Sequence, residues 1–199
     1  MTRPQLDPAF WAGKKVLVTG HTGFKGAWLC HWLLRLGARV TGFALPPETS
    51  PNLYSLLKLE TRLTSTFGDL RDKELVQKVL GETRPEIILH LAAQALVRPS
   101  YDDPISTFES NVMGTAYLLD ATRTVQTSDV CLVATTDKVY RNLEHGVPFR
   151  EDDPLGGHDP YSASKAATEI VISSYRQSFF EASTTKLLSA RAGLSLIHI

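Results

Sequence analysis

The sequence contains few cysteines and no excess of charge of either sign. Its 199 residues include 2 cysteines, Cys30 and Cys131. Both lie in apolar stretches, so we expect neither a disulfide framework nor a metal site. Lys+Arg and Asp+Glu number 21 each. Because a nucleic-acid surface needs an excess of basic side chains, this balance argues against a nucleic-acid partner.

Long apolar runs are also missing. The amino-terminal stretch MTRPQLDPAFWAGKK has no apolar segment of the kind found in secretory signals. No apolar run reaches the ~18 residues that a membrane-spanning helix needs. We therefore expect a cytoplasmic protein with no membrane partner. The apolar fraction of 43% is sufficient for the core of one ordinary α/β domain.

Short apolar runs alternate with helical patterns along the chain. Strands are expected at residues 15–19, 39–45, 64–67, 86–91, 130–135 and 186–190. Helices are expected from 26 to Gly37, 72–83, 105–124 and 159–180, with one helical turn within 53–59. Continuous apolar strands are typical of parallel sheets covered on both faces. The alternation therefore predicts a doubly wound, mostly parallel Rossmann-type α/β sheet with helices on both faces.

A glycine-rich turn, Gly20-His21-Thr22-Gly23-Phe24-Lys25-Gly26, follows the first expected strand. Gly20 permits a tight turn, Gly23 lets the backbone approach a pyrophosphate with a positive φ, and Gly26 lets helix and strand pack closely. The spacing G-x-x-G-x-x-G differs from the standard G-x-G-x-x-G, and the alternative is a simple tight turn. Its place between strand and helix favours a dinucleotide-binding site.

The adenosine end of that site has a weaker signal. The second strand ends in Phe43-Ala44-Leu45, without the acidic residue that would hold a ribose 2′-hydroxyl. No arginine follows closely to select a 2′-phosphate. Asp69, after the third strand, is a candidate for contact with the adenine amino group, and its alternative role is a helix N-cap. In the first helix, Trp28 and Trp32 have helical spacing and are interpreted as core residues.

Tyr161 and Lys165 form a candidate reactive pair. They are four residues apart, so they lie on one face of the helix that follows the fifth strand. The phenol has a reference pKa of ~10, and a nearby ammonium lowers the pKa of such a group. Tyr161 is therefore a candidate base for a sugar hydroxyl. A lone Tyr-x-x-x-Lys match is common by chance, and the position of this one supports the assignment.

Thr136, Asp137 and Lys138 lie at the carboxyl end of the fifth strand, the edge where doubly wound sheets bind ligands. They supply a hydrogen-bond donor, an acid and a base. The alternative is a solvated strand end in which Asp137 and Lys138 form a weak ion pair.

The residues from about 10 to 193 resemble the extended short-chain dehydrogenase/reductases and, within them, the CDP-glucose 4,6-dehydratases. The resemblance rests on residues 10–29, 44–47, 68–72, 91–94 and 161–165. Two features discriminate among sister families. Lys25 stands where sisters usually have an aliphatic residue, and Thr136-Asp137-Lys138 stands where sister sugar dehydratases usually read Thr-Asp-Glu.

The resemblance implies NAD as the cofactor and a sugar nucleotide as the small-molecule substrate. The residues expected to bind the cofactor are Gly20, Thr22, Gly23, Phe24, Lys25, Gly26, Asp69, Leu70, Leu91, Ala92, Ala93, Gln94, Ser110, Tyr161 and Lys165. Those expected to be catalytic are Thr136, Asp137, Lys138, Tyr161 and Lys165. Asn111, beside Ser110, either bridges active-site water and ribose or is an ordinary polar residue of its helix.

The implied reaction converts CDP-glucose to CDP-4-keto-6-deoxyglucose, a hydro-lyase reaction of deoxysugar and O-antigen biosynthesis. Hydride passes from C4 to NAD while Tyr161 takes the hydroxyl proton and Thr136 holds the same hydroxyl. Water then leaves across C5–C6, with Lys138 as base and Asp137 as acid, and hydride returns to C6. The alternatives are a sugar-nucleotide 4-epimerase, which does not need Asp137 and Lys138, and an inactive dinucleotide-binding fragment.

The carboxyl terminus departs from the family pattern. Residues 194–199, LSLIHI, are encoded by CTG TCT CTT ATA CAC ATC, which matches the mosaic end of a transposon used to fragment DNA for sequencing. We therefore expect residues 1–193 to be an NAD-binding Rossmann-type domain and residues 194–199 to be a non-native tail. The protein would then be an amino-terminal fragment that lacks its substrate lobe and is inactive by itself. The full-length form is expected to be a homodimer.

Overall fold

The structure, a computed structural model, describes residues 7–144 and 146–193. The tail predicted at residues 194–199 lies outside the described residues. Six strands form one sheet: β1 (Lys15–Thr19), β2 (Arg39–Ala44), β3 (Thr64–Phe67), β4 (Ile87–His90), β5 (Val130–Thr136) and β6 (Lys186–Ala192). All paired strands are parallel, in the order β3-β2-β1-β4-β5-β6. The predicted Rossmann-type architecture is confirmed.

The sheet reverses its order at β1, which pairs with β2 on one side and β4 on the other. At such a switch point the connections leave to opposite faces, and a crevice opens at the carboxyl ends of the strands. We call the edge where the six strands end the carboxyl edge. The candidate site residues follow these strand ends.

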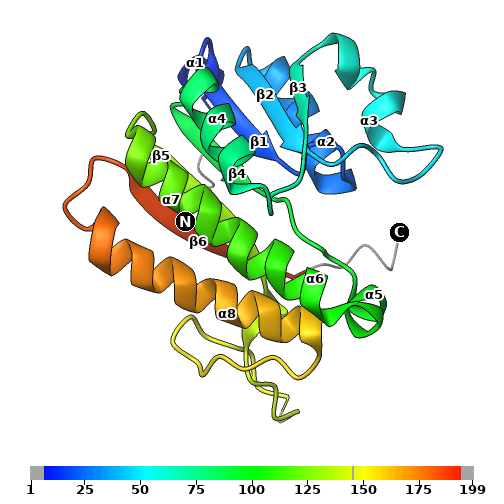
Figure 1. The fold of residues 1–199 in the computed structure, drawn as a ribbon, viewed down its shortest axis with the longest axis vertical. Coiled ribbons are helices and arrows are strands. Elements are labelled where there is room, and N and C mark those ends of the chain that lie inside the picture. The colour runs from blue at the N-terminus through cyan, green and yellow to red at the C-terminus, as the bar shows by residue number, and fades with distance from the viewer. Residues whose placement is uncertain (1–6, 145, 194–199) are drawn as a thin grey trace.

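Helices cover both faces of the sheet. The longer helices are α2 (Phe24–Arg35), α4 (Lys73–Thr83), α7 (Gly114–Val125) and α8 (Pro160–Tyr175). The shorter ones are α1 (Pro8–Trp11), α3 (Leu53–Leu56), α5 (Val97–Asp102), α6 (Pro104–Phe108), the 3-10 turns η1 (Leu59–Thr61) and η3 (Asp137–Val139), and the π-helical turns η2 (Glu109–Met113) and η4 (Arg176–Phe180). Figure 1 shows α4, α7 and α8 side by side on one face, with α2 behind the sheet.

Two buried clusters fill the space between the sheet and these layers. The α7-side core consists of Leu17, Phe43, Leu70, Val76, Val79, Leu80, Ile88, Leu118, Leu119, Ala121, Cys131, Val133, Ile172, Phe180 and Leu187. The α2-side core consists of Val16, Val18, Ala27, Cys30, Leu33, Ala38, Val40, Tyr54, Leu59, Ile87 and Leu89. Alternate residues of β1 point into different cores, as the pleat of a strand requires. Both cysteines are buried free thiols, and burial raises the pKa of each to about 12.

Local capping explains where the helices begin. The Asp72 side chain accepts a hydrogen bond from the Leu75 amide at 3.0 Å, and the Asp159 side chain accepts one from the Ser162 amide at 2.9 Å. Each is the N-cap of a helix that is expected from the sequence to begin at that residue. Arg84 ends α4 in a left-handed conformation.

The interpretation of Trp28 and Trp32 as core residues is wrong. Trp28 is 50% exposed and Trp32 is 53% exposed. The face of α2 that meets the sheet is formed instead by small residues together with Leu33. A Cβ atom at Gly26 would overlap the Gly20 carbonyl, so α2 lies close to the turn, and its bulky tryptophans point outward.

Two other features differ from the prediction. The helix expected over 105–124 is interrupted by η2, and α5 was not expected. α5 is one short turn, held because the Ser100 hydroxyl donates to the Val97 carbonyl at 2.6 Å and accepts from the Tyr161 amide at 3.1 Å. The second contact joins residues far apart in the sequence, which local patterns do not reveal. None of the helices in the described part of the chain has the length and apolarity of a membrane-spanning helix.

Candidate active site

The carboxyl edge brings together the glycine turn, residues 91–94, residues 136–138 and the first turns of α8. A Cβ atom at Gly20 would lie 2.7 Å from the Ala92 amide nitrogen, so these two segments touch. A Cβ atom at Gly193, which follows β6, would lie 3.5 Å from Asp137 Oδ2. The edge therefore gathers side chains from four connections that are distant in the sequence.

The three glycines of the turn meet different constraints. Gly20 has a φ of +75°, and a side chain there would press on the backbone of residues 91 and 92. Gly26 allows the close approach of α2, as expected. The positive φ expected at Gly23 is wrong, since Gly23 has a φ of −73° and extended geometry. The tight turn is made three residues earlier at Gly20, as expected, where the strand ends.

The amino end of α2 is shaped for an anion. Gly23 is its N-cap and provides no side-chain hydrogen bond, so the amides of the first turn are not capped by a side chain. The helix dipole adds positive potential there. Thr22 Oγ1 donates to the Leu45 carbonyl at 2.9 Å, which ties the turn to the end of β2, while Phe24 and Lys25 are exposed beside it. This cradle fits a pyrophosphate.

His21 occupies a pocket beside β2 and β3 that sequence reasoning did not assign. Its Nε2 lies 3.1 Å from Ser65 Oγ, which also lies 2.8 Å from the Tyr54 hydroxyl. A Cβ atom at Gly42 would overlap the imidazole ring, so that glycine makes the room for it. The ring is fully buried, and burial lowers the pKa of His21 to about 4, so it is neutral at pH 7.

Asp69 lies at the end of β3 with its carboxylate bound to a neighbour. Its oxygens accept from the Arg71 amide at 2.9 Å and from the Arg71 guanidinium at 2.7 Å. Hydrogen bonding to Arg71 holds the pKa of Asp69 below its usual range. The N-cap of α4 is Asp72, so the alternative N-cap role for Asp69 is wrong. Leu70 is 6% exposed and packs into the α7-side core beneath this turn.

A buried histidine network fixes the loop that begins at Leu91. His90 Nδ1 lies 2.6 Å from Thr19 Oγ1, and its Nε2 lies 3.0 Å from Thr115 Oγ1. The same Thr19 oxygen accepts from the amides of Leu91 and Ala92 at 3.2 and 3.1 Å. Burial lowers the pKa of His90 to about 3, so the ring is neutral and can accept one hydrogen bond while donating the other.

Asn111 connects that loop to α8 through a π-helical turn. Its Oδ1 accepts from the Gln94 amide at 2.8 Å, and its Nδ2 donates to the Gln94 carbonyl at 3.0 Å and to Ser164 Oγ at 2.8 Å. Hydroxyls of Thr115 and Thr168 donate to the Asn111 carbonyl. Of the two roles considered for Asn111, the alternative of an ordinary polar residue of its helix does not account for these contacts, and the bridging of water and ribose stays a prediction. Ser110 precedes it in the same turn and is half-buried. π-helical turns are frequent at functional sites.

Tyr161 and Lys165 lie on the inner face of α8, 7% and 6% exposed. Lys165 Nζ donates to the Ala134 carbonyl at 3.3 Å. Burial lowers the pKa of Lys165 to about 8. The pKa of Tyr161 is raised, chiefly by burial and partly by the charge of Asp137, while the Thr136 hydroxyl lowers it. The expectation that Lys165 lowers the Tyr161 pKa is thus wrong, because burial dominates.

Thr136, Asp137 and Lys138 turn over the end of β5 as a 3-10 turn. Thr136 is 4% exposed, and its hydroxyl donates to Asp137 Oδ1 at 3.0 Å. Asp137 and Lys138 are exposed at this edge. An exposed acid and an exposed cation beside a buried tyrosine can exchange protons with a ligand bound over the edge. In the described residues, no three His, Cys, Asp or Glu side chains gather as metal ligands.

Sequence reasoning also missed Glu169 and Arg191. Glu169 is buried on α8, and Arg191 Nη2 donates to its Oε2 at 3.0 Å. One signal could have found Glu169: it continues the four-residue spacing of Tyr161 and Lys165 along the same helix face. Arg191 has no such local signal, because only the pairing of β6 with β5 brings it here.

Known proteins share both the sequence and this fold. The family model described as GDP-mannose 4,6 dehydratase matches residues 17–194. A CDP-glucose 4,6-dehydratase of Salmonella typhimurium is 46% identical over 193 residues, which cover 94% of this chain and 54% of that protein. A UDP-glucose 4-epimerase of Mycolicibacterium smegmatis is 35% identical, covering 81% of this chain and 51% of that protein.

A solved structure is also similar to this chain in both fold and sequence. The UDP-glucose 4-epimerase of Thermus thermophilus in complex with NAD has a TM-score of 0.75 and 34% identity, covering 88% of this chain and 54% of that one. The chain spans about half the length of the curated relatives it matches.

Proposed function

Because the chain belongs to the GDP-mannose 4,6 dehydratase family, we propose that it is the NAD-binding part of a sugar-nucleotide 4,6-dehydratase that acts on CDP-glucose. One observation carries the proposal: Tyr161 and Lys165 on α8 stand beside Thr136-Asp137-Lys138 at the same edge as the glycine turn. The cofactor, the base and the acid for the dehydration would then meet at the carboxyl edge of the sheet.

The chain's own residues fit NAD. The uncapped amides of α2 would hold the pyrophosphate, and Gly23 would leave room for it. Residues 91–94 would border the cofactor from β4, and Tyr161 and Lys165 would face its nicotinamide ribose. When bound, NAD supplies the capacity to remove a hydride from the sugar and return it. The solved epimerase that holds NAD supports this assignment.

Each catalytic residue would then act on one particular atom of the sugar. Tyr161 takes the proton of the C4 hydroxyl, and Thr136 donates a hydrogen bond to the same oxygen. Asp137 protonates the departing C6 hydroxyl, and Lys138 removes the proton at C5. Burial raises the Tyr161 pKa, so Tyr161 would act as a base where the positive charge of the oxidised nicotinamide and a hydrogen bond from the C4 hydroxyl offset that burial.

The sugar nucleotide needs more than residues 1–193, which we propose form the cofactor domain. In a full-length protein, the part that corresponds to the unmatched half of the relatives would supply the remaining contacts to the substrate. We expect the chain alone to bind NAD weakly and to leave CDP-glucose unchanged, since positioning contributes ~7–11 kcal/mol to lowering such barriers. We also expect the full-length form to be a homodimer that makes deoxysugars in the cytoplasm.

A 4-epimerase is the second candidate. It is favoured by the likeness to the Thermus thermophilus UDP-glucose 4-epimerase, the 34% identical solved structure. Such an enzyme would use Tyr161 and Lys165 and would not require Asp137 or Lys138. The two functions therefore differ in what residues 137 and 138 contribute.

Calorimetric titration of the chain with NAD tests the cofactor site. Gly23→Val should abolish binding and leave the protein folded, because Gly23 has an extended backbone that valine adopts. Its methyl groups would occupy the approach to the α2 amides. The matched control is Gly81→Val in α4, where a Cβ atom meets nothing within 4 Å and NAD affinity should stay the same. Unchanged affinity in folded Gly23→Val would show that the loop is a turn only.

Dehydration is tested in a fusion of this chain to the carboxyl half of the Salmonella relative, incubated with CDP-glucose and quenched for mass spectrometry. Tyr161→Phe should leave the sugar unchanged. Asp137→Asn should yield a 4-keto sugar that retains its C6 oxygen, because general acid catalysis is typically worth ~10²–10⁴-fold. If Asp137→Asn and Lys138→Ala both form 6-deoxy product at the parent rate, these two residues are not the acid and the base of the dehydration. A parent fusion that forms the 4-epimer of CDP-glucose, separated by chromatography, and no 6-deoxy product would favour the epimerase.

A further inference from the structure

An ion pair between buried Glu169 and half-buried Arg191 lies beneath the candidate site, outside the residues that would touch cofactor or sugar. Glu169 is 5% exposed and follows Lys165 by one turn of α8. Its Oε1 accepts from Thr135 Oγ1 at 2.5 Å. Its Oε2 accepts from Ser189 Oγ at 3.2 Å and from Arg191 Nη2 at 3.0 Å. One carboxylate thus binds donors from both β5 and β6.

Arg191 extends this connection to the segment after β5. It is the register partner of Thr135 in the β5–β6 pair. Its Nη1 donates to the Tyr140 hydroxyl at 3.0 Å and to the Glu151 carbonyl at 2.7 Å. The guanidinium carbon lies 5.0 Å from the centre of the Tyr140 ring, which stacks on Phe149. Arg191 therefore ties the strand to the segment that leads into α8.

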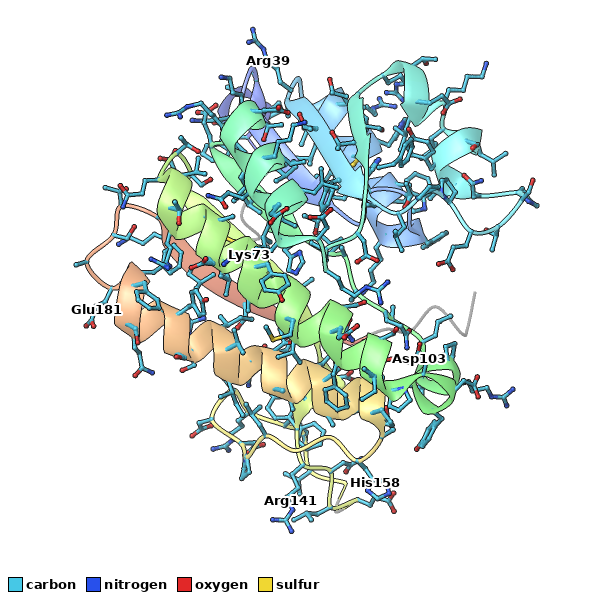
Figure 2. All side chains as sticks on the ribbon, in the orientation of Figure 1. Arg39, Lys73, Asp103, Arg141, His158 and Glu181 are labelled. Atoms are coloured by element: carbon cyan, nitrogen blue, oxygen red, sulfur yellow. The ribbon has the colours of Figure 1, made fainter. Side chains whose placement is uncertain are left out.

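That segment projects from the body of the molecule. Figure 2 shows Arg141 and His158, near its two ends, close together and far from Arg39 at the start of β2. Arg141 directly follows Tyr140, and His158 directly precedes the N-cap of α8. A fixed segment consequently fixes the start of the helix that carries Tyr161.

A buried ion pair is weak evidence for stability, because well-packed apolar side chains often do as well in its place. What distinguishes this pair is its position. Thr135 immediately precedes Thr136, and Glu169 shares a helix face with Tyr161 and Lys165.

We propose that Glu169 and Arg191 are positioning residues of the candidate site: the pair holds Thr135, and through it Thr136, against α8, and it places a permanent negative charge one turn from the Lys165 ammonium. The inference rests on the proposed function for the roles of Thr136 and Lys165. The geometry of the pair does not depend on it.

The charged groups around Lys165 come from three elements. Glu169 on α8 raises the pKa of Lys165, and Lys25 on α2 lowers it, as burial does. His90 on β4 is neutral at pH 7, because burial lowers its pKa to about 3. The net pKa of Lys165 is about 8, so the ammonium persists at pH 7 by a small margin. Burial and Lys25 lower the pKa of Lys165, and Glu169 is the group that opposes them.

The test is a pH titration of Lys165 by NMR in the whole 199-residue chain, with ¹³C-labelled lysine and the signal assigned by Lys165→Met. The wild-type midpoint should be about 8. Glu169→Gln keeps the shape of the side chain and should lower the midpoint by about one unit. The matched control is Glu181→Gln, on an exposed residue beyond the far end of α8 (Figure 2), and should not move it.

A role confined to stability would reduce resistance to urea and leave the Lys165 midpoint in place. An unchanged midpoint in folded Glu169→Gln, or an equal shift in Glu181→Gln, would overturn the proposal. If Glu169→Gln does not fold, the double variant Glu169→Gln/Arg191→Met removes both charges of the pair, and the same lowered midpoint is expected. The titration uses no ligand, so failure of the chain to bind NAD would count against the proposed function and not against this pair.

Discussion

Gly20 and Gly23 are three residues apart in one turn, yet their backbone conformations restrict substitution differently. Gly20 has a positive φ and no room for a Cβ atom beside Ala92. Gly23 is extended, and a Cβ atom there would meet only the Gly20 carbonyl oxygen, at 3.4 Å. The fold therefore requires glycine at position 20. At position 23 glycine would be required only by a ligand that approaches the backbone.

Alanine substitution separates these two roles. Gly20→Ala should lower the free energy of unfolding by about 2–4 kcal/mol, from left-handed strain and overpacking together. Gly23→Ala should cost less than about 1 kcal/mol, since alanine is only a poorer N-cap than glycine. Urea unfolding monitored by circular dichroism measures both. Equal losses would mean that the turn makes no such distinction.

Lys165 carries a buried positive charge that the fold does not need. Its pKa falls from 10.5 to about 8 on folding, so below pH 8 the desolvated ammonium lowers the free energy of unfolding. Lys165→Met should therefore raise the free energy of unfolding at pH 7 by about 1–3 kcal/mol. Such a gain on removing a site residue is typical of functional positions.

The pH dependence of that gain follows from the same pKa. Between pH 8 and 10.5 the unfolded chain binds a proton that the folded protein has lost, so wild-type stability from this group rises over that range. The advantage of Lys165→Met should then shrink, as urea titrations at pH 7 and pH 9.5 would show. Lys138→Met is the control, because Lys138 is exposed and its removal should change little. A variant less stable than wild type at pH 7 would contradict the argument.

At the scale of single elements, the two faces of α2 differ in the size of their side chains. Its contact with the sheet is made by Gly26, Ala27, Cys30 and Leu33, while its two tryptophans are half-exposed. Small residues next to a glycine turn let a helix approach closely, and the bulk is left on the outside. The helix therefore contributes to the core through shape more than through area.

This arrangement predicts opposite outcomes for two substitutions in α2. Trp28→Gln should change the free energy of unfolding by less than about 1 kcal/mol, because half of the side chain is already in water. Leu33→Ala, at a residue only 2% exposed, should cost about 2–5 kcal/mol. Urea unfolding monitored by circular dichroism compares them. A large loss in Trp28→Gln would indicate that the exposed aromatic face is covered in solution.

At the scale of the whole molecule, the sheet is shared by two cores on opposite faces. The fluorescence of all three tryptophans monitors the α2 side of the sheet. Trp11 packs against the α2-side core, and Trp28 and Trp32 belong to α2. Leu118 belongs to the α7-side core and is fully buried. Since β1, β2 and β4 each contribute buried side chains to both cores, loss of one core should unfold the other.

Leu118→Ala should therefore shift the tryptophan fluorescence transition in urea as much as the circular dichroism transition, by about 2–5 kcal/mol. The two probes should coincide in wild type and in the variant. A fluorescence transition that stays in place while circular dichroism shifts would mean that the two faces unfold separately. The control is Leu56→Ala at a residue 68% exposed, where both transitions should remain.

Local patterns in the sequence determined the elements and the order in which they occur. The apolar runs at β1 to β6 and the signals that begin helices at Asp72 and Asp159 act within a few residues, and these strands and helix starts were predicted correctly. The same holds for the Tyr161–Lys165 spacing and the glycine turn, because both arise from neighbours on one helix or one turn. These interactions need no information about what else the chain packs against.

Tertiary structure decided what those residues experience. Burial raises the Tyr161 pKa although an ammonium lies one turn away, and it lowers the Lys165 pKa to about 8. The interruption of the 105–124 helix at Asn111 and the burial of Glu169 against Arg191 depend on contacts between segments tens of residues apart. Desolvation and long-range hydrogen bonds exist only once the sheet has brought those segments together, and so the sequence pattern alone could not reveal them.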